Sequence, residues 1–370
     1  MKSIKHVVSV SGGKDSAATL LLALERCPRD SVVPIFCDTG NEHREVYEYL
    51  NYLEHVLGVR IVRLKADFSE QIAAKRVFIA RDQRTRREYD TVPVFETDGV
   101  TPVPKRNGRG EIVMHKVRRG GVMVEEPVQK TRRVGCGRRV RWSNKAKRRA
   151  LAVLYPTGNP FLDLCLWKGR FPSRKAQFCT EELKRNMAVS FQIDLLNQGY
   201  RVISWQGVRR DESHNRRNAK LFERIGPSLY AFRPLVEWTA MQVFDYCGSK
   251  GLQPNPLYKQ GMGRVGCMPC INAGKDELVQ ISVRFPGYLK EKARWEALVS
   301  QASKRGFSTF FNKELHDDNK ADRRVHEANR VEAVIEWAKT GRGGRQMSFV
   351  SDLIDPSACS SSYGLCDQAG

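Results

Sequence analysis

The first 65 residues alternate short apolar runs with amphipathic stretches. Residues 7–10, 32–37 and 60–65 are short runs rich in β-branched side chains, which is typical of buried strands. Two stretches with helical spacing of apolar residues, 17–24 and 45–57, lie between them. This order of strand, helix, strand, helix and strand predicts a parallel, doubly wound α/β sheet.

The same pattern resumes near residue 150, after a stretch of different character. We expect an α/β domain formed by residues 1–74 and 150–275, interrupted by a basic insertion at 75–149. A helical C-terminal region is expected at 276–340, and a polar tail that contains cysteines at 341–370. Ligands of such sheets bind beyond the carboxyl ends of the strands, so the loops after strands 7–10 and 32–37 are the candidate site.

The insertion holds much of the positive charge of the chain. Residues 75–149 contain 22 Lys or Arg and eight Asp or Glu, within a chain of net charge +22. Short β-like pieces occur at 111–117 and 122–124, and Trp142 lies within a basic run. Such an excess favours a nucleic-acid partner, with cations on phosphates and Trp142 available for base stacking. The alternative is a basic insertion without a specific partner.

Composition narrows the class of protein further. The chain has no apolar run of about 18 residues, so no membrane span is expected. The N-terminus lacks the apolar core of a signal peptide, and we expect a cytoplasmic protein. The ten cysteines are then expected to be reduced, with metal, cluster or reactive-thiol roles for those that lie close together in the sequence.

A glycine loop follows the first predicted strand and opens the first predicted helix. It reads SGGKDS, in which glycine backbone amides and the helix N-terminus attract an anion. It is neither GxxxxGK[ST] nor GxGxxG. The alternative is a chance glycine turn. The residues predicted to bind nucleotide phosphates are Ser11, Gly12, Gly13, Lys14, Asp15 and Ser16.

This loop resembles the pyrophosphate-binding PP-loop of the adenine nucleotide α-hydrolase superfamily. With PIFCDTGNEHREVYEYL, GVRRDESHNR and NPLYKQGMGRVGCMPC, the chain resembles the phosphoadenosine phosphosulfate (PAPS) reductase branch, in its phage-type form. The resemblance implies ATP phosphates at the loop, Mg²⁺ near Asp15, and nucleotide or metal contacts from Asp38, Thr39 and Glu42. It implies charge neutralisation by three arginines, and the predicted catalytic set is Lys14, Asp15, Asp38 and Arg209, with Arg210 and Arg216 as further phosphate-binding residues.

One departure distinguishes members of this family. Sulfonucleotide reductases have a degenerate loop at this position and an ECGxH-type tail, whereas this chain has an intact SGGKDS and the tail DPSACSSSYGLCDQAG. The resemblance therefore favours an ATP pyrophosphatase that activates a nucleic acid, like the iron–sulfur enzyme of DNA phosphorothioation, with a sulfur donor such as a cysteine desulfurase. The alternatives are a PAPS or APS reductase with a cysteine nucleophile, and a nucleotide-gated nucleic-acid-binding protein without chemistry.

Two cysteine pairs suggest a cluster. Cys267 and Cys270 form a CxxC after a glycine loop, and Cys359 and Cys366 lie in the polar tail. Four thiolates suit a [4Fe–4S] cluster, and Zn²⁺ is the alternative. The resemblance makes Cys179 a rival ligand. A CxxC without metal is the remaining possibility.

Overall fold

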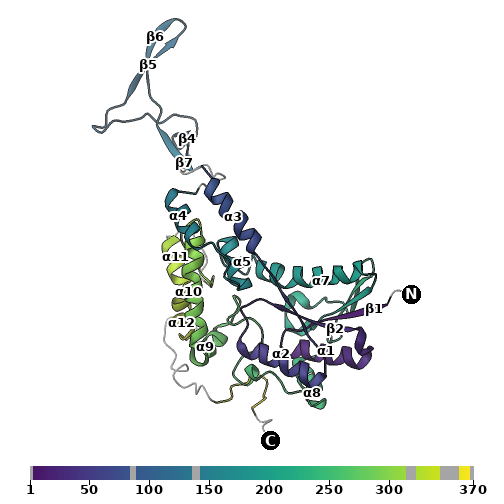
Figure 1. Ribbon diagram of the computed structural model, residues 1–370. Coiled ribbons are helices and arrows are strands. Elements are labelled where there is room, and N and C mark those ends of the chain that lie inside the picture. Colours follow the sequence, from purple (N-terminus) through teal and green to yellow (C-terminus); the bar gives the residue numbers. More distant parts are fainter. Residues whose placement is uncertain (1–2, 84–88, 136–141, 314–321, 342–357, 367–370) are drawn as a thin grey trace. The chain divides into compact units, whose positions relative to one another are not determined.

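The computed structural model describes residues 3–83, 89–135, 142–313, 322–341 and 358–366. The chain forms two compact units (Figure 1). One unit comprises Met1–Arg76 and Arg149–Gly370, and the other comprises Val77–Arg148.

The larger unit is built on a six-stranded sheet with the order β3-β2-β1-β8-β10-β9. Neighbours from β3 to β10 run parallel, and β9 pairs antiparallel with β10 at the edge. In the central strand, Val7 lies opposite Val33 of β2 and Ser204 of β8. The predicted mostly parallel α/β sheet is confirmed. Its strands are β1 (Ile4–Ser9), β2 (Val32–Asp38), β3 (Val62–Lys65), β8 (Arg201–Trp205), β9 (Phe222–Gly226) and β10 (Leu229–Phe232).

Helices cover both faces of this sheet (Figure 1). Helix α7 (Asn186–Asn197) lies on one side, and α1 (Lys14–Arg26), α2 (Arg44–Leu57) and α8 (Ala240–Ser249) lie on the other. Leu195 of α7 packs on Val7, Ile35 and Val202 from three adjacent strands. Because β1, β2 and β8 are parallel, the loops that follow them lie at one edge of the sheet.

The C-terminal helices form part of the same unit. Helix α10 packs against α5, α9 and α12, and Phe161 of α5 stacks on Trp295 of α10. The remaining bounds are α3 (Ser69–Arg81), α4 (Asn144–Val153), α5 (Pro160–Lys168), α6 (Phe178–Thr180), a π-helical turn (Glu181–Arg185), α9 (Lys275–Arg284), α10 (Pro286–Ala302), α11 (Asp322–Ala328) and α12 (Val331–Ala338).

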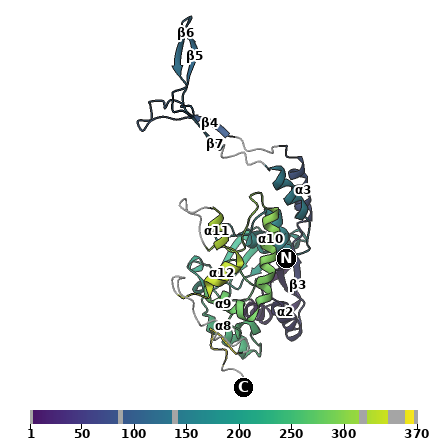
Figure 2. The same cartoon turned by 90° about the vertical axis from the view of Figure 1, so that its left-hand side faces the viewer.

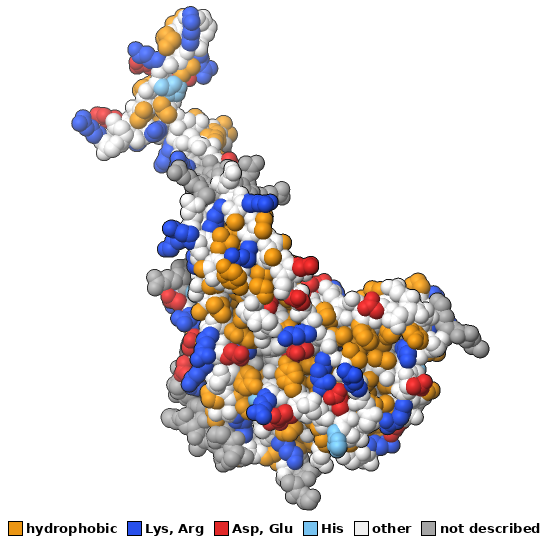
Figure 3. Space-filling model, viewed as in Figure 1, with side chains coloured by type: hydrophobic (Ala, Val, Ile, Leu, Met, Phe, Trp, Pro, Cys, Tyr) orange, Lys and Arg blue, Asp and Glu red, His pale blue; other side chains and the backbone are white. Residues whose placement is uncertain are grey.

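The smaller unit contains two antiparallel strand pairs (Figure 2). Strand β4 (Tyr89–Pro93) pairs with β7 (Thr131–Gly135), and β5 (Met114–Arg119) pairs with β6 (Val122–Pro127). Lys and Arg side chains are spread along its visible face (Figure 3). Trp142 corrects one expectation: the residue is 7% exposed, so it is a packing residue and presents no free face for base stacking.

Among the described residues, no helix is both long and apolar enough to cross a membrane.

Candidate nucleotide-binding site

The SGGKDS segment folds into a tight loop between β1 and α1. The backbone amide of Ser11 donates to Oγ of Ser16 at 3.0 Å, and that hydroxyl donates to the carbonyl oxygen of Gly13 at 2.8 Å. Gly12 has φ +74°, and a Cβ there would lie 2.9 Å from Cγ1 of Val46 in α2. Glycine is therefore required at residue 12 both by the backbone conformation and by the closeness of α2.

Asp15 lies between two cationic side chains. Its Oδ2 is 3.3 Å from Nζ of Lys14, and its Oδ1 accepts from Nε of Arg209 at 2.5 Å. Nη1 of Arg209 also donates to both carboxylate oxygens of Asp211, at 2.5 and 2.6 Å. Lys14 and Arg209 are buried. The structure thus brings three of the four predicted catalytic residues into one ion-pair network.

A glycine after β8 makes this network possible. A Cβ on Gly207 would lie 2.9 Å from the backbone carbon and oxygen of Asp15. The chain leaving β8 therefore passes directly against the first turn of α1 and delivers Arg209 to Asp15. The resemblance implied a phosphate-binding role for Arg209, and the parallel pairing of β1 with β8 brings its loop to Asp15.

The other two predicted arginines have different partners. Arg210 donates through Nε to the carbonyl oxygen of Ala219 at 3.0 Å and pairs with Glu237. Arg216 pairs with Glu212 on the surface. In this structure Arg209 is the member of the set that contacts the loop.

Two residues of the NPLY segment belong to the site, although sequence reasoning missed them. Oη of Tyr258 accepts from the backbone amide of Lys14 at 3.0 Å, and Nδ2 of Asn255 donates to the carbonyl oxygen of Gly12 at 3.2 Å. The available signal was the position of NPLY within a family motif. This segment therefore fixes the loop from a point more than 240 residues away in the chain.

Three aromatic rings surround the amine of Lys14. Nζ lies 5.8 Å from the ring centre of Phe244, 5.5 Å from that of Tyr258 and 5.0 Å from that of Tyr363. Rings at these distances stabilise a cation through their π-electrons. They also leave the lysine side chain only 6% exposed.

A second polar cluster follows β2. Oδ1 of Asp38 accepts from the backbone amide of Gly40 at 2.9 Å and from Oη of Tyr47 at 2.8 Å. Oγ1 of Thr39 donates to Oε1 of Glu42 at 2.7 Å, and both residues are buried. The predicted pair Asp38 and Thr39 is thus held at the carboxyl edge of the sheet by local hydrogen bonds.

The CxxC segment is attached to this second cluster. The backbone amide of Met268 donates to the carbonyl oxygen of Asn41 at 2.7 Å, and Sγ of Cys267 lies 3.7 Å from Oε1 of Glu42 and 3.5 Å from Oγ1 of Thr39. Burial raises the pKa of the Cys267 thiol to about 11. The negative charges of Cys267 and Glu42 raise the pKa of Lys184.

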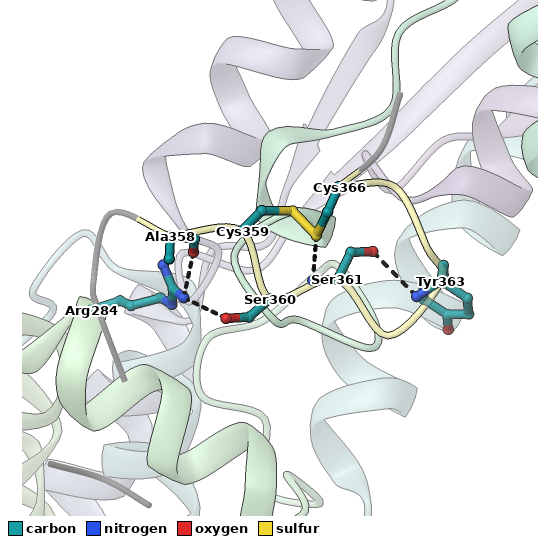
Figure 4. Close-up of a disulfide and its surroundings, with 7 residues drawn as sticks. All are labelled: Arg284, Ala358, Cys359, Ser360, Ser361, Tyr363 and Cys366. Atoms are coloured by element: carbon teal, nitrogen blue, oxygen red, sulfur yellow. Dashed lines mark hydrogen bonds between the residues drawn. A yellow bond between two sulfur atoms is a disulfide. The ribbon is translucent and has the colours of Figure 1, made fainter. Parts of the chain in front are cut away.

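The predicted cluster ligands are not brought together as expected. Cys359 and Cys366 form a disulfide with each other (Figure 4), so they supply no thiolates, and the expectation that all cysteines are reduced is wrong for this pair. Within the described part of the chain, no group of three or more His, Cys, Asp or Glu is arranged to hold a metal ion. The four-cysteine set for [4Fe–4S] or Zn²⁺ therefore does not fit this structure.

Cys179, the rival ligand, lies in α6, directly before the π-helical turn. Burial raises the pKa of Cys179, and its electrostatic interaction with Cys270 raises that pKa further. Cys179 is thus a neighbour of the CxxC segment, and the residues that the structure describes complete no metal site there.

Comparisons with known proteins show which family the chain is similar to. The phosphoadenosine phosphosulfate reductase domain matches residues 5–94 and 162–273, a span that includes the loop, Asp38, Arg209 and Cys267. A 37.8 kDa protein of Escherichia phage 186 is 40% identical over 376 residues, covering 99% of this chain and 98% of the relative.

Shorter segments of the chain are similar to sulfonucleotide reductases. The adenosine 5′-phosphosulfate reductase of Salinibacter ruber is 35% identical over 65 residues, which is 17% of this chain and 26% of that enzyme. The PAPS reductase structure from Candida auris, a phosphate complex, is 12% identical and covers 72% of this chain and 82% of that one, with a TM-score of 0.35. The family domain matches more than half of the residues of this chain. The chain therefore belongs to the PAPS reductase family.

Proposed function

We propose that the chain binds ATP at residues 11–16 and cleaves it to AMP and pyrophosphate while activating a nucleic acid. The observation that supports this most directly is the pair of cations on Asp15. Lys14 and Arg209 are held beside the carboxylate of Asp15, where their positive charges can oppose the charge of a phosphate chain.

The proposed reaction is an adenylyl transfer. An oxygen of the acceptor attacks the α-phosphorus of Mg·ATP, a new P–O bond forms, and the bond from the α-phosphorus to the bridging oxygen breaks. Pyrophosphate leaves with its charge opposed by Lys14 and Arg209, and displacement at the adenylated position releases AMP. A sulfur-donor protein such as a cysteine desulfurase supplies the displacing group in the thiolating form of this proposal. No step requires the cluster that the cysteine arrangement does not fit.

The nucleic-acid part of the proposal rests on the smaller unit. Arg118, Arg132 and Arg133 are exposed side chains on its strand pairs. Exposed cations spread over extended strands are suited to phosphate backbones and carry no sequence information by themselves. We therefore propose phosphate contacts here and chemistry at the loop.

Sulfonucleotide reduction is the second candidate. It is favoured by the named relatives and by the position of the tail, in which Tyr363 contacts Lys14 only three residues from Cys366. Against it stand the intact loop and the disulfide that holds Cys366.

The test is product analysis with the full chain. Purified protein is given ATP, PAPS or APS, with and without single-stranded and double-stranded DNA and RNA, and AMP, pyrophosphate, ADP, phosphate and sulfite are measured. The proposal expects AMP and pyrophosphate from ATP in the presence of one nucleic acid. Dithiol-dependent sulfite release from PAPS or APS establishes the reductase instead, and ADP with phosphate contradicts both.

A matched pair of variants ties the activity to the loop. Lys14→Met is expected to lower the turnover about 100- to 1,000-fold, the usual effect of removing one charge-stabilising group. Lys5→Met, at a lysine in β1 whose Nζ donates to the carbonyl oxygen of Asp30, is expected to leave the turnover unchanged. Salt-sensitive nucleic-acid binding that survives Lys14→Met, with no turnover in either protein, is the outcome for a binding protein without chemistry.

A further inference from the structure

The tail segment 358–366 is a closed loop fastened to the larger unit. The Cys359–Cys366 disulfide joins its ends across seven positions (Figure 4). The backbone amide of Ser360 donates to the carbonyl oxygen of Lys259 at 2.8 Å. Nη2 of Arg284 donates to the carbonyl oxygen of Ala358 and to Oγ of Ser360, both at 2.8 Å. Leu365 is buried.

This loop delivers one side chain to the phosphate-binding site. The ring of Tyr363 packs on Phe244 and Tyr258, with ring centres 5.1 and 5.8 Å apart, and its Oη donates to the carbonyl oxygen of Gly263 at 2.6 Å. Its centre is the nearest of the three rings to Nζ of Lys14. Tyr363 is therefore the one of these three rings that the tail contributes beside the Lys14 amine.

The other two rings have fixed places in the fold. Phe244 belongs to α8, which packs on α1, and Tyr258 is bonded to the backbone of Lys14. Tyr363 is held instead by a short segment whose conformation the disulfide constrains. Cross-linking restricts the open states of such a segment, and cutting the cross-link restores them.

We propose that the disulfide loop 359–366 is a redox-operated strap that blocks the phosphate site while oxidised. A dithiol reductant transfers two electrons and two protons, the Cys359–Cys366 bond breaks to two thiols, and the reductant becomes a disulfide. Tyr363 then leaves Lys14, and phosphate gains access to the amine. In a reducing compartment the site is open, and oxidation closes it. The phosphate part of this inference rests on the proposed function.

The direct test is the reactivity of Lys14, which requires no activity. The full chain, oxidised with diamide or reduced with dithiothreitol, is pulsed with an amine-acylating reagent, and each lysine is quantified by peptide mass spectrometry. Labelling of Lys14 is expected to rise on the order of tenfold on reduction, while that of exposed Lys65 stays constant. Equal Lys14 labelling in both states overturns the strap.

Variants separate this disulfide from other thiols. Cys359→Ser with Cys366→Ser is expected to give fast Lys14 labelling without reductant, and Tyr363→Ala is expected to do the same with the disulfide intact. Cys27→Ser, at a cysteine outside the strap, is expected to keep the full response to reductant. Slow labelling in the double variant overturns the proposal.

Binding of a fluorescent ATP analogue distinguishes the strap from the function. Tighter binding after reduction supports both. If reduction speeds Lys14 labelling but the chain binds no nucleotide, the result supports the strap and contradicts the proposed function.

Discussion

Arg209 donates through Nε to Oδ1 of Asp15 at 2.5 Å, although 194 positions separate the two residues in the sequence. The contact joins the loop after β8 to the first turn of α1. Arg209 is 4% exposed at its side chain and Asp15 is 19% exposed. The pair is therefore well shielded from water, and its loss has consequences for both stability and charge at the site.

Removing the arginine is expected to affect both stability and chemistry. Arg209→Met leaves Asp15 with Lys14 as its neighbouring cation, and breaking a buried pair costs about 3–5 kcal/mol. Nucleotide turnover is expected to fall at least as much as in Lys14→Met. Urea unfolding and product analysis measure the two effects.

The matched control is Arg63→Met. Arg63 of β3 pairs with Glu54 at 2.8 Å and is 38% exposed, so its loss is expected to cost under about 1 kcal/mol. Turnover should stay at the level of the parent chain. If the Arg209 variant behaves like this control, the Asp15 pair has no special role.

Gly12→Ala is expected to destabilise the loop for two separable reasons. The positive φ costs about 1–2 kcal/mol for any L-residue, and the new methyl group would lie 2.9 Å from Val46. Gly199→Ala is the control, because Gly199 has φ +91° with open space around it. The Gly12 variant should lose more unfolding free energy than the control, and Val46→Ala in the same chain should recover part of the difference. If both variants lose the same free energy of unfolding, α2 shifts away from the new methyl group without a measurable cost.

Glu296 makes the stability depend on pH. Burial raises its pKa to about 7, although its oxygens accept from the backbone amides of Phe310 and Val331. The folded state holds the proton more tightly than the unfolded state, so the free energy of unfolding falls as pH rises from about 4.5 to about 7. The loss from this one group is on the order of 3 kcal/mol.

Glu296→Gln is expected to remove this dependence. Glutamine replaces one acceptor oxygen with a donor, so the variant should be less stable than the parent chain at pH 5. Because glutamine does not titrate, the free energy of unfolding of the variant should change less between pH 5 and pH 8. Glu336→Gln, at an exposed ion pair with Lys339, is expected to keep the slope of the parent chain. Urea titrations across this range measure both, and an unchanged slope in Glu296→Gln would refute the assignment.

Nucleic-acid binding is expected to weaken when the smaller unit loses charge. Replacing Arg118, Arg132 and Arg133 by serine should lower affinity for all sequences alike and reduce the slope of log K against log salt by up to about three. Substituting Arg185, Arg201 and Arg224 on the larger unit by serine removes the same charge elsewhere and controls for net charge. If the two triple variants weaken nucleic-acid binding equally, the smaller unit is not the preferred binding surface.

The parallel core could be predicted because local patterns there agree with the fold. Residues 32–37 and 45–57 were expected as strand and helix, and the structure has Val32–Asp38 and Arg44–Leu57. Strand β9 was missed, because its FERIG sequence has no apolar alternation and its pairing comes from β10. Edge strands with polar side chains are specified by their neighbour more than by their own sequence.

The candidate site could be predicted only in part. Lys14, Asp15 and Arg209 meet because the strand order places their loops together, which the motifs indicated. Tyr258 could not be found from spacing, since its role is a hydroxyl contact to one backbone amide. The disulfide of the tail was also missed. Composition indicated only the redox compartment of the protein, and two cysteines in a polar tail are compatible with a disulfide, a metal site or free thiols.

The hydrogen bond from the amide of Lys14 to Tyr258 has a consequence for biosynthesis. The ribosome makes the loop 244 positions before its partner Tyr258, and it also makes β8, the neighbour of β1, well after the loop. Helix α1 can form early, whereas the finished phosphate site must wait until most of the chain has been translated. A nascent or prematurely terminated chain that ends before Tyr258 therefore lacks the contact that fixes the loop.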